Sequence, residues 1–253
     1  MRALAVMAVS LGCGACAGTD VLRGDGAGDR ARAPDPSFAV LSRSEAGAKT
    51  QAIPAEVLVG KPGTTRRFVA LAGSRKGKVV EQRFVDAGDG KLAVEEHDGE
   101  PSERFLLEPR DGGWAITTVE TYGEDSRSVF EQPLRFAPAR LVAGESHPCG
   151  SPMAVTLLSS GKPRASGTAR RNLRISGEAE IDLHGERLRA TVVEVEFVAE
   201  LDAATARRVS ELFVVEDRGI VAEQWRERLL ILGVIPRNSR ETLAIEPSKG
   251  GTR

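Results

Sequence analysis

Apolar and polar residues alternate along much of the chain after Ile53, with a period of two residues. The clearest case is the segment 173–183. Its apolar residues all fall on odd positions, and the residues between them are mostly charged or polar; the apolar set is Leu173, Ile175, Ala179, Ile181 and Leu183. Because side chains alternate between the two faces of a strand, this pattern predicts an antiparallel strand with one buried face and one face in water.

A second long strand is predicted at 187–201, after a turn at His184-Gly185-Glu186. Its apolar residues change phase, because those up to Val192 occupy even positions and those from Val193 occupy odd positions. A β-bulge near Val192 and Val193 would return both sets to a common face. Long strands with a bulge bend, so we expect a curved sheet.

Shorter apolar runs, separated by turn sequences such as DAGDG (86–90), HDGEP (97–101) and PRDGG (109–113), predict further strands. These strands are expected at 66–71, 78–85, 91–96, 103–107, 114–122, 128–136, 154–158, 209–215 and 220–232. Residues 202–208 fit either a helical turn or a wide hairpin connection. The predicted fold class is all-β and mainly antiparallel, a curved meander sheet or half-barrel with few helices.

The C-terminal half, from Leu134 to Ile245, resembles the curved antiparallel sheets of bacterial envelope proteins, the half-barrel class that includes lipoprotein-localisation factors. The likeness lies in Ile181 and Gly185-Glu186 before a long strand, and in the turn from Val215 into a strand through Glu223. It concerns topology, and no functional residue is transferred by it.

The first sixteen residues have the three parts of an export signal. Arg2 gives a positive start, residues 3–11 form a short apolar core, and small residues surround Cys13 and Cys16. The segment resembles the signal peptides of bacterial lipoproteins, in which a small residue precedes a cysteine that is diacylated. That resemblance implies a lipid anchor on Cys13, with Cys16 as the alternative. An ordinary secretory signal cleaved after Ala15 or Ala17 is the other interpretation.

Four parts follow from these patterns: a signal peptide (1–16), a flexible tether (17–53), an antiparallel β-domain (54–246) and a disordered tail (247–253). A sub-boundary within the β-domain, near 148–152, is left open. The localisation expected is exported, either periplasmic or associated with the outer membrane, with membrane attachment through the lipid anchor. The net charge of −1 and the interspersed charges give no reason to expect a nucleic-acid partner.

The candidate chemistry is sparse. His147 and Cys149 lie two positions apart, but the prolines at 148 and 152 make this a rigid loop, which argues against a nucleophile–base pair. If Cys13 is acylated, Cys16 and Cys149 could form a disulfide; because Cys16 lies in a flexible segment and is a poor partner, we expect Cys149 to be a free, partly buried thiol. Three histidines without paired spacing predict no metal site, and no cofactor motif is present. The carboxylates of Glu194, Glu196 and Glu200 alternate with apolar residues and should lie on a solvated face.

A curved sheet with an apolar concave face either fills that face with its own side chains or holds an apolar ligand. Residues 229–235 form the most apolar stretch after the signal and are expected to be a buried strand. The residues expected to line a ligand groove are Phe197, Trp225, Leu230 and Leu232. The leading hypothesis is a non-enzymatic envelope lipoprotein that binds an apolar ligand or a partner protein. A structural scaffold of the envelope and an exported hydrolase with an unrecognised site are the alternatives.

Overall fold

The computed structural model describes residues 36–47 and 50–247. Nearly all regular structure in this part is antiparallel β, with one short α-helix and one 3₁₀ turn. The elements are β1 (Phe38–Ser44), β2 (Ile53–Pro54), α1 (Ala55–Leu58), β3 (Thr65–Ala72), β4 (Val79–Gly88), β5 (Lys91–His97), β6 (Pro101–Arg110), β7 (Gly113–Thr121), η1 (Tyr122–Glu124), β8 (Ser126–Ala137), β9 (Arg140–Leu141), β10 (Cys149–Leu157), β11 (Pro163–Leu183), β12 (Glu186–Leu201), β13 (Ala204–Val215), β14 (Gly219–Ile231) and β15 (Ile235–Ile245).

Twelve of these strands close into a barrel. Strands β3 to β8 form a meander, β8 pairs with β10 and β10 with β11, and the meander continues from β11 to β15. One long-range pairing completes the ring, because β15 pairs with β3; β11 pairs with both of its sequence neighbours, β10 and β12. The predicted antiparallel all-β fold is therefore confirmed, and the curved sheet closes on itself.

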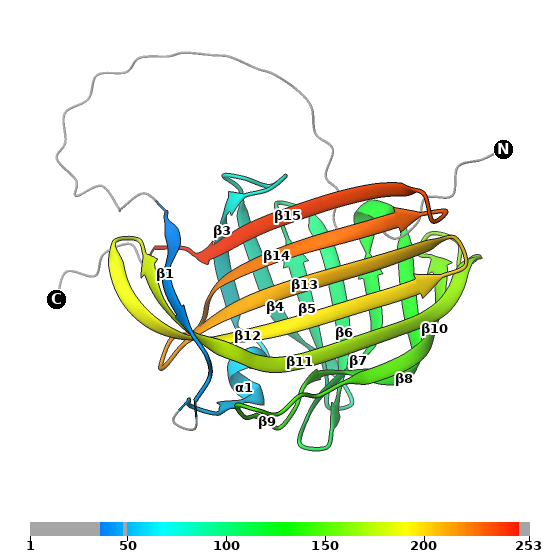
Figure 1. Ribbon diagram of the computed structural model, residues 1–253. Coiled ribbons are helices and arrows are strands. Elements are labelled where there is room, and N and C mark those ends of the chain that lie inside the picture. Colours follow the sequence, from blue (N-terminus) through cyan, green and yellow to red (C-terminus); the bar gives the residue numbers. More distant parts are fainter. Residues whose placement is uncertain (1–35, 48–49, 248–253) are drawn as a thin grey trace, which may run out of the picture.

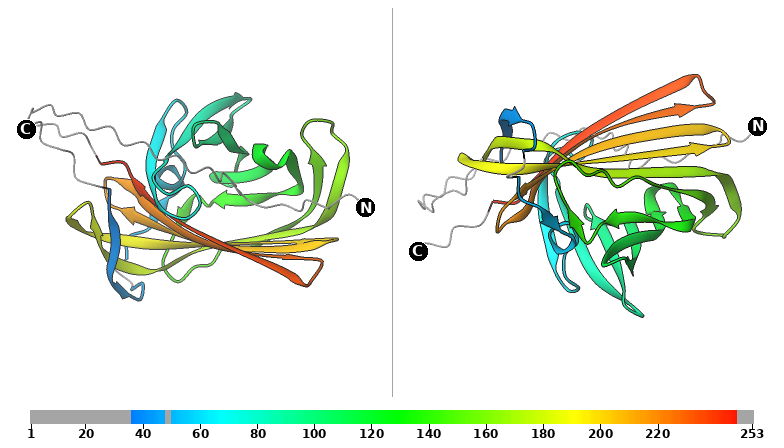
Figure 2. Two further views of the ribbon diagram at one scale, coloured as in Figure 1. Left: turned by 90° about the horizontal axis from the view of Figure 1, so that it is seen from above. Right: turned by 60° about the horizontal axis from the view of Figure 1, so that its bottom comes forward.

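The barrel has two unlike walls (Figure 1). The long strands β11 to β15, drawn in yellow to red, lie side by side across the front, and the shorter strands β3 to β8 lie behind them. Figure 2 shows the long strands as a twisted band that extends beyond the shorter strands at both ends. The helical turn α1 and the small β2–β9 ladder lie at one end of the barrel, where Leu58 and Leu141 enter the main core.

The long strands carry buried side chains on both faces. The predictions of a single buried face at 173–183 and of a bulge at Val192 and Val193 are therefore wrong. Ser176 is the extra residue of a bulge in β11, because Ile175 pairs with Val193 while Gly177 pairs with Val192. Beyond this bulge the odd-numbered residues of β11 face the other side of the sheet. Leu173 and Ile175 therefore lie in the main core, whereas Ala179, Ile181 and Leu183 belong to a second core.

Strand β12 itself needs no bulge at Val192 and Val193. These neighbours point to opposite faces, as in any strand, and both are buried because a core lies on each side: Val192 in the second core and Val193 in the main core. The apparent change of phase in the sequence thus marks the place where the buried face of the sheet changes.

Strand β1 covers the second core and lies within the segment that was predicted to be a flexible tether. It pairs with β11, and Phe38 packs edge-on against Phe213 of β13 with ring centroids 4.9 Å apart. The hairpin between β11 and β12 curls over the same region, where the His184 ring contacts the Ile245 carbonyl oxygen at 2.7 Å. The tether interpretation does not hold for residues 38–44.

Other segments also differ from their predictions. β10 begins at Cys149 and is paired on both sides, so 148–152 divides no sheet. Residues 202–203 form a tight hairpin turn, and β13 starts at Ala204. The apolar run 229–235 contains the end of β14, a turn at 232–234 and the start of β15, whose eleven residues were not predicted as a strand.

Candidate functional site

The barrel encloses a cavity of about 190 Å³. Six of the eight phenylalanines of the chain line it, and the remaining two, Phe38 and Phe213, form the second core. The lining phenylalanines are Phe68, Phe84, Phe105, Phe130, Phe136 and Phe197. They come from both walls of the barrel, so the cavity is a feature of the closed ring.

The four residues predicted to line a groove occupy different places. Phe197 of β12 lines the cavity. Trp225 of β14 is buried and faces the lumen, where the guanidinium of Arg208 lies 4.5 Å from its ring centroid. Leu230 and Leu232 do not line the cavity. Leu230 has the opposite strand parity to Trp225, and Leu232 lies in the turn after β14 with 63% of its surface exposed.

Strand register places charged side chains in rows across the lumen. Arg171 of β11 pairs with Phe197, Phe197 pairs with Arg208 of β13, and Arg208 pairs with Glu227 of β14. Directly paired residues of antiparallel strands point to the same face. One aromatic side chain of the cavity wall is thus flanked by two guanidinium groups.

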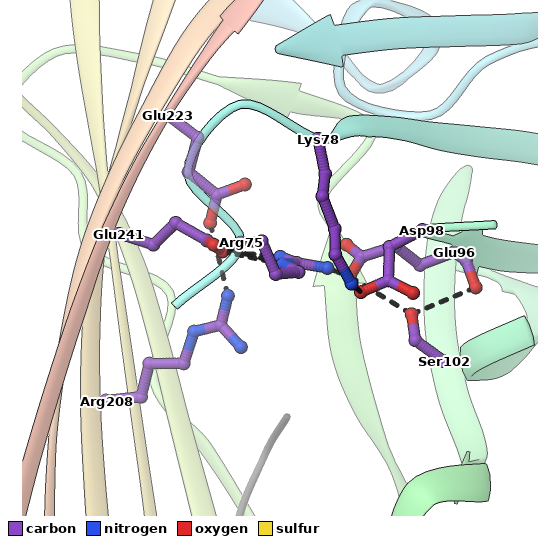
Figure 3. Close-up of polar contacts among 8 residues, drawn as sticks. All are labelled: Arg75, Lys78, Glu96, Asp98, Ser102, Arg208, Glu223 and Glu241. Atoms are coloured by element: carbon purple, nitrogen blue, oxygen red, sulfur yellow. Dashed lines mark hydrogen bonds and ion pairs between the residues drawn. The ribbon is translucent and has the colours of Figure 1, made fainter. Parts of the chain in front are cut away.

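Arg75 connects the two walls at one end of the lumen (Figure 3). It lies in the loop between β3 and β4 and is only 5% exposed. Its Nε donates to Glu241 Oε1 at 3.0 Å, its Nη2 donates to Glu241 Oε2 at 2.5 Å, and its Nη1 donates to Glu96 Oε1 at 2.5 Å. Glu241 belongs to β15 and Glu96 to β5, so a single guanidinium joins the long and the short strands.

A second charged group lies beside the first in Figure 3. Arg208 Nη2 lies 3.4 Å from Glu223 Oε1, and Ser210 donates a further hydrogen bond to Glu223. Burial raises the pKa of Glu223, an effect that the nearby Arg208 charge partly opposes. All three side chains line the cavity.

Glu103 is the cavity-lining carboxyl without a partner. It is 7% exposed, and among the described residues none makes a hydrogen bond or an ion pair with its side chain. Burial raises its pKa from the ordinary 4.5 to about 8, which the Arg208 charge reduces and the Glu96 charge increases. Glu103 is therefore expected to keep its proton at neutral pH.

Glu227 and Trp225 are further buried groups with unsatisfied polar atoms. Glu227 Oε2 and Trp225 Nε1 have no hydrogen-bond partner among the described residues. Burial raises the pKa of Glu227 to about 7. Five carboxyl groups and two guanidinium groups thus gather in this part of the lumen, and they are Glu96, Glu103, Glu223, Glu227 and Glu241 with Arg75 and Arg208.

Arg171 lines a different part of the cavity, and its guanidinium group already has partners within the protein. Its Nη1 donates to the carbonyl oxygens of Arg135 and Phe136, and its guanidinium lies 5.1 Å from the ring centroid of Phe136. Burial lowers its pKa to about 10. Cys149, the neighbour of Arg171 across β10 and β11, is a free, partly buried thiol whose Sγ accepts a hydrogen bond from the Arg135 N–H at 3.2 Å.

The outward carboxylates of β12 have ordinary partners on neighbouring strands. Glu194 pairs with Arg174 at 2.8 Å, Glu196 pairs with Arg207 at 2.7 Å, and Glu200 pairs with Arg170 at 2.5 Å. Within 36–47 and 50–247, no group of His, Cys, Asp and Glu side chains has the arrangement of a metal site. The same part of the chain contains no helix of sufficient length and apolar character to cross a bilayer.

These features define a closed antiparallel barrel with an aromatic cavity and a charged cluster at one side of it. No protein-family model and no curated protein matches the chain. Among solved structures, the hypothetical lipoprotein YmcC from Escherichia coli (K12) aligns with 79% of this chain and 91% of its own, at 11% identity and a TM-score of 0.37. A likeness at this level carries no argument. The predicted signal peptide, with Cys13 and Cys16, lies outside the described residues.

Proposed function

We propose that this protein is an exported, lipid-anchored envelope protein that holds a small, mainly apolar molecule inside its barrel. The observation that carries the proposal is the cavity of about 190 Å³, walled by six phenylalanines. A core is ordinarily packed to a density that leaves few voids larger than a water molecule. A cavity of this size instead leaves space for a small organic molecule, since an apolar cavity of about 150 Å³ is enough to bind benzene.

The cavity wall has the composition of a ligand site. Pockets for small molecules are lined mainly by hydrophobic and aromatic side chains, with a few polar groups that fix orientation. Here the phenylalanines supply the apolar surface, and Glu103, Arg208 and Glu223 supply polar groups on one side. The envelope location and the anchor rest on the sequence of residues 1–16, which remains a prediction.

Gentle purification from the cell envelope followed by native mass spectrometry and solvent extraction tests the proposal. We expect a small molecule to accompany the protein in near-stoichiometric amount. Val195→Phe places a large side chain in the cavity wall and should abolish this co-purification. The matched control is Val209→Phe, because Val209 pairs with Glu196 on the outward face of β13 and should retain the molecule.

A wild-type protein that carries nothing and binds no added apolar compound would overturn the proposal. That result would favour the scaffold hypothesis, in which a partner protein would contact the turn after β14. Val234 and Ile235 are 73% and 51% exposed there.

A hydrolytic function is the second candidate, and the raised pKa of Glu103 favours it. A buried carboxyl that keeps its proton near neutral pH can act as a general acid. Glu103 and Glu223 both line the cavity, with pKa values raised by burial. No Ser, Cys or His among the described residues is hydrogen-bonded to Glu103. Turnover of an extracted molecule by the wild type, lost in Glu103→Gln, would favour this function over simple binding.

A further inference from the structure

The charged side of the cavity suggests what kind of molecule the barrel takes. Glu103 is buried, lines the cavity and has no hydrogen-bond or ion-pair partner within 36–47 and 50–247, which is unusual because buried carboxyl groups are normally paired or hydrogen-bonded. The groups around it come from five other elements of the barrel. They are Arg75 of the β3–β4 loop, Glu96 of β5, Arg208 of β13, and Glu223 and Glu227 of β14, with Glu241 of β15 behind Arg75.

We propose that the ligand is a small amphipathic cation, with an amidinium or ammonium group against Glu103 and an apolar body among the phenylalanines. This inference rests on the proposed binding function and adds the charge of the ligand to it. A cation would give Glu103 the partner that the described part of the chain does not supply. It would also face aromatic rings, which attract cations.

An anionic ligand fits the cavity less well, because each guanidinium group in the lumen already has partners. Arg75 is committed to Glu241 and Glu96. Arg208 contacts Glu223 and the Trp225 ring, and Arg171 donates to two backbone carbonyl oxygens. An anion would have to displace one of these contacts, and it would meet five carboxyl groups that the two walls bring to the same part of the lumen.

The protonation of Glu103 supports the same assignment. A cation that binds beside Glu103 favours its ionised form, so binding releases the proton that burial retains. Carboxyl groups of Glu223 and Glu227 nearby also have pKa values raised by burial. Affinity for a cation should therefore increase as the pH rises toward the pKa of Glu103.

Three planar compounds of nearly identical shape separate charge from apolar character: benzamidine, benzamide and benzoate. Isothermal titration calorimetry on the full chain should give at least about tenfold tighter binding for benzamidine than for benzamide, and weaker binding for benzoate. Glu103→Gln should remove the difference between benzamidine and benzamide. Glu200→Gln, on an exposed outward side chain, should leave it unchanged.

The outcomes distinguish the two proposals. If benzamide binds in the cavity but benzamidine has no advantage, or if Glu103→Gln keeps that advantage, the cation assignment is overturned while the binding function stands. If none of the three compounds binds and the native protein carries no molecule, the binding function itself fails. A measurement on wild-type protein needs no variant: the advantage of benzamidine should grow from about pH 6 to about pH 8, and a constant ratio contradicts the assignment.

Discussion

Glu103 should make the stability of the barrel dependent on pH. Burial raises its pKa from 4.5 to about 8, so the native protein keeps a proton that the unfolded chain releases. Between these two values the native state binds more protons than the unfolded state. The contribution of Glu103 to the free energy of unfolding should therefore fall as the pH rises through this window, by up to about 1.4 kcal/mol per pH unit, and should change no further above it.

Chemical denaturation of the wild type and Glu103→Gln at a series of pH values measures this contribution. Glutamine has nearly the same shape and does not titrate, so the difference in stability between the two proteins should shift in favour of the variant from about pH 5 to about pH 8. Glu227, with a pKa of about 7, remains in both proteins, so its titration cancels in the difference apart from its charge interaction with Glu103. Parallel pH profiles for the two proteins would show that Glu103 does not retain its proton.

Some charged residues of the site could have been found from the sequence, and others could not. Glu223 and Glu227 share the parity of Trp225 in one predicted strand, so the alternation already placed two carboxyl groups on the face of a buried aromatic residue. Arg75 and Glu241 are separated by 166 positions, and Glu241 lies in a strand that was not predicted. Their contact depends on the pairing of β15 with β3, which no local pattern reveals.

At the scale of elements, the second core should contribute strongly to stability. Phe213 of β13 is fully buried there and touches Phe38 of β1. Phe213→Ala should lower the free energy of unfolding by about 3–5 kcal/mol, because it removes a buried ring and leaves a cavity. Val129→Ala, at a side chain that is 42% exposed, should change it by no more than about 0.5 kcal/mol.

The same variant should also loosen β1, which hydrogen exchange of the Ala39–Ser44 amides would detect as faster exchange than in the wild type. A loss of stability below about 1 kcal/mol for Phe213→Ala would mean that β1 and the curled hairpin do not pack on this face.

Local alternation predicted most strands but not the face that each one buries. The odd-numbered apolar residues of β11 appear as one stripe in the sequence, yet the extra residue Ser176 sends the two halves of the stripe into different cores. β1 was missed because Phe38, Val40 and Leu41 are few apolar residues in a polar segment. The surface that orders them comes from β11 and from Phe213 of β13, both far along the chain.

At the scale of the whole molecule, the closing of twelve strands into one barrel explains why the lumen contains both phenylalanines and charged side chains. A barrel of eight strands can be filled by its own side chains, and larger barrels leave internal space. Twelve strands therefore need large side chains, and the chain provides six phenylalanines with long Arg and Glu side chains linked in pairs. The space that these groups do not fill is the cavity, so the proposed site is a consequence of strand number.

Attachment of the protein to a membrane depends on whether Cys13 or Cys16 is acylated. If Cys13 carries the anchor, Cys13→Ser should abolish incorporation of labelled palmitate and release the protein from membranes, because stable attachment requires the acyl chains. Cys16→Ser should keep both label and attachment. The reverse pattern would assign the anchor to Cys16. Label in neither protein and a wild type that is released freely would support the ordinary secretory signal, in which case the barrel would meet its ligand unattached.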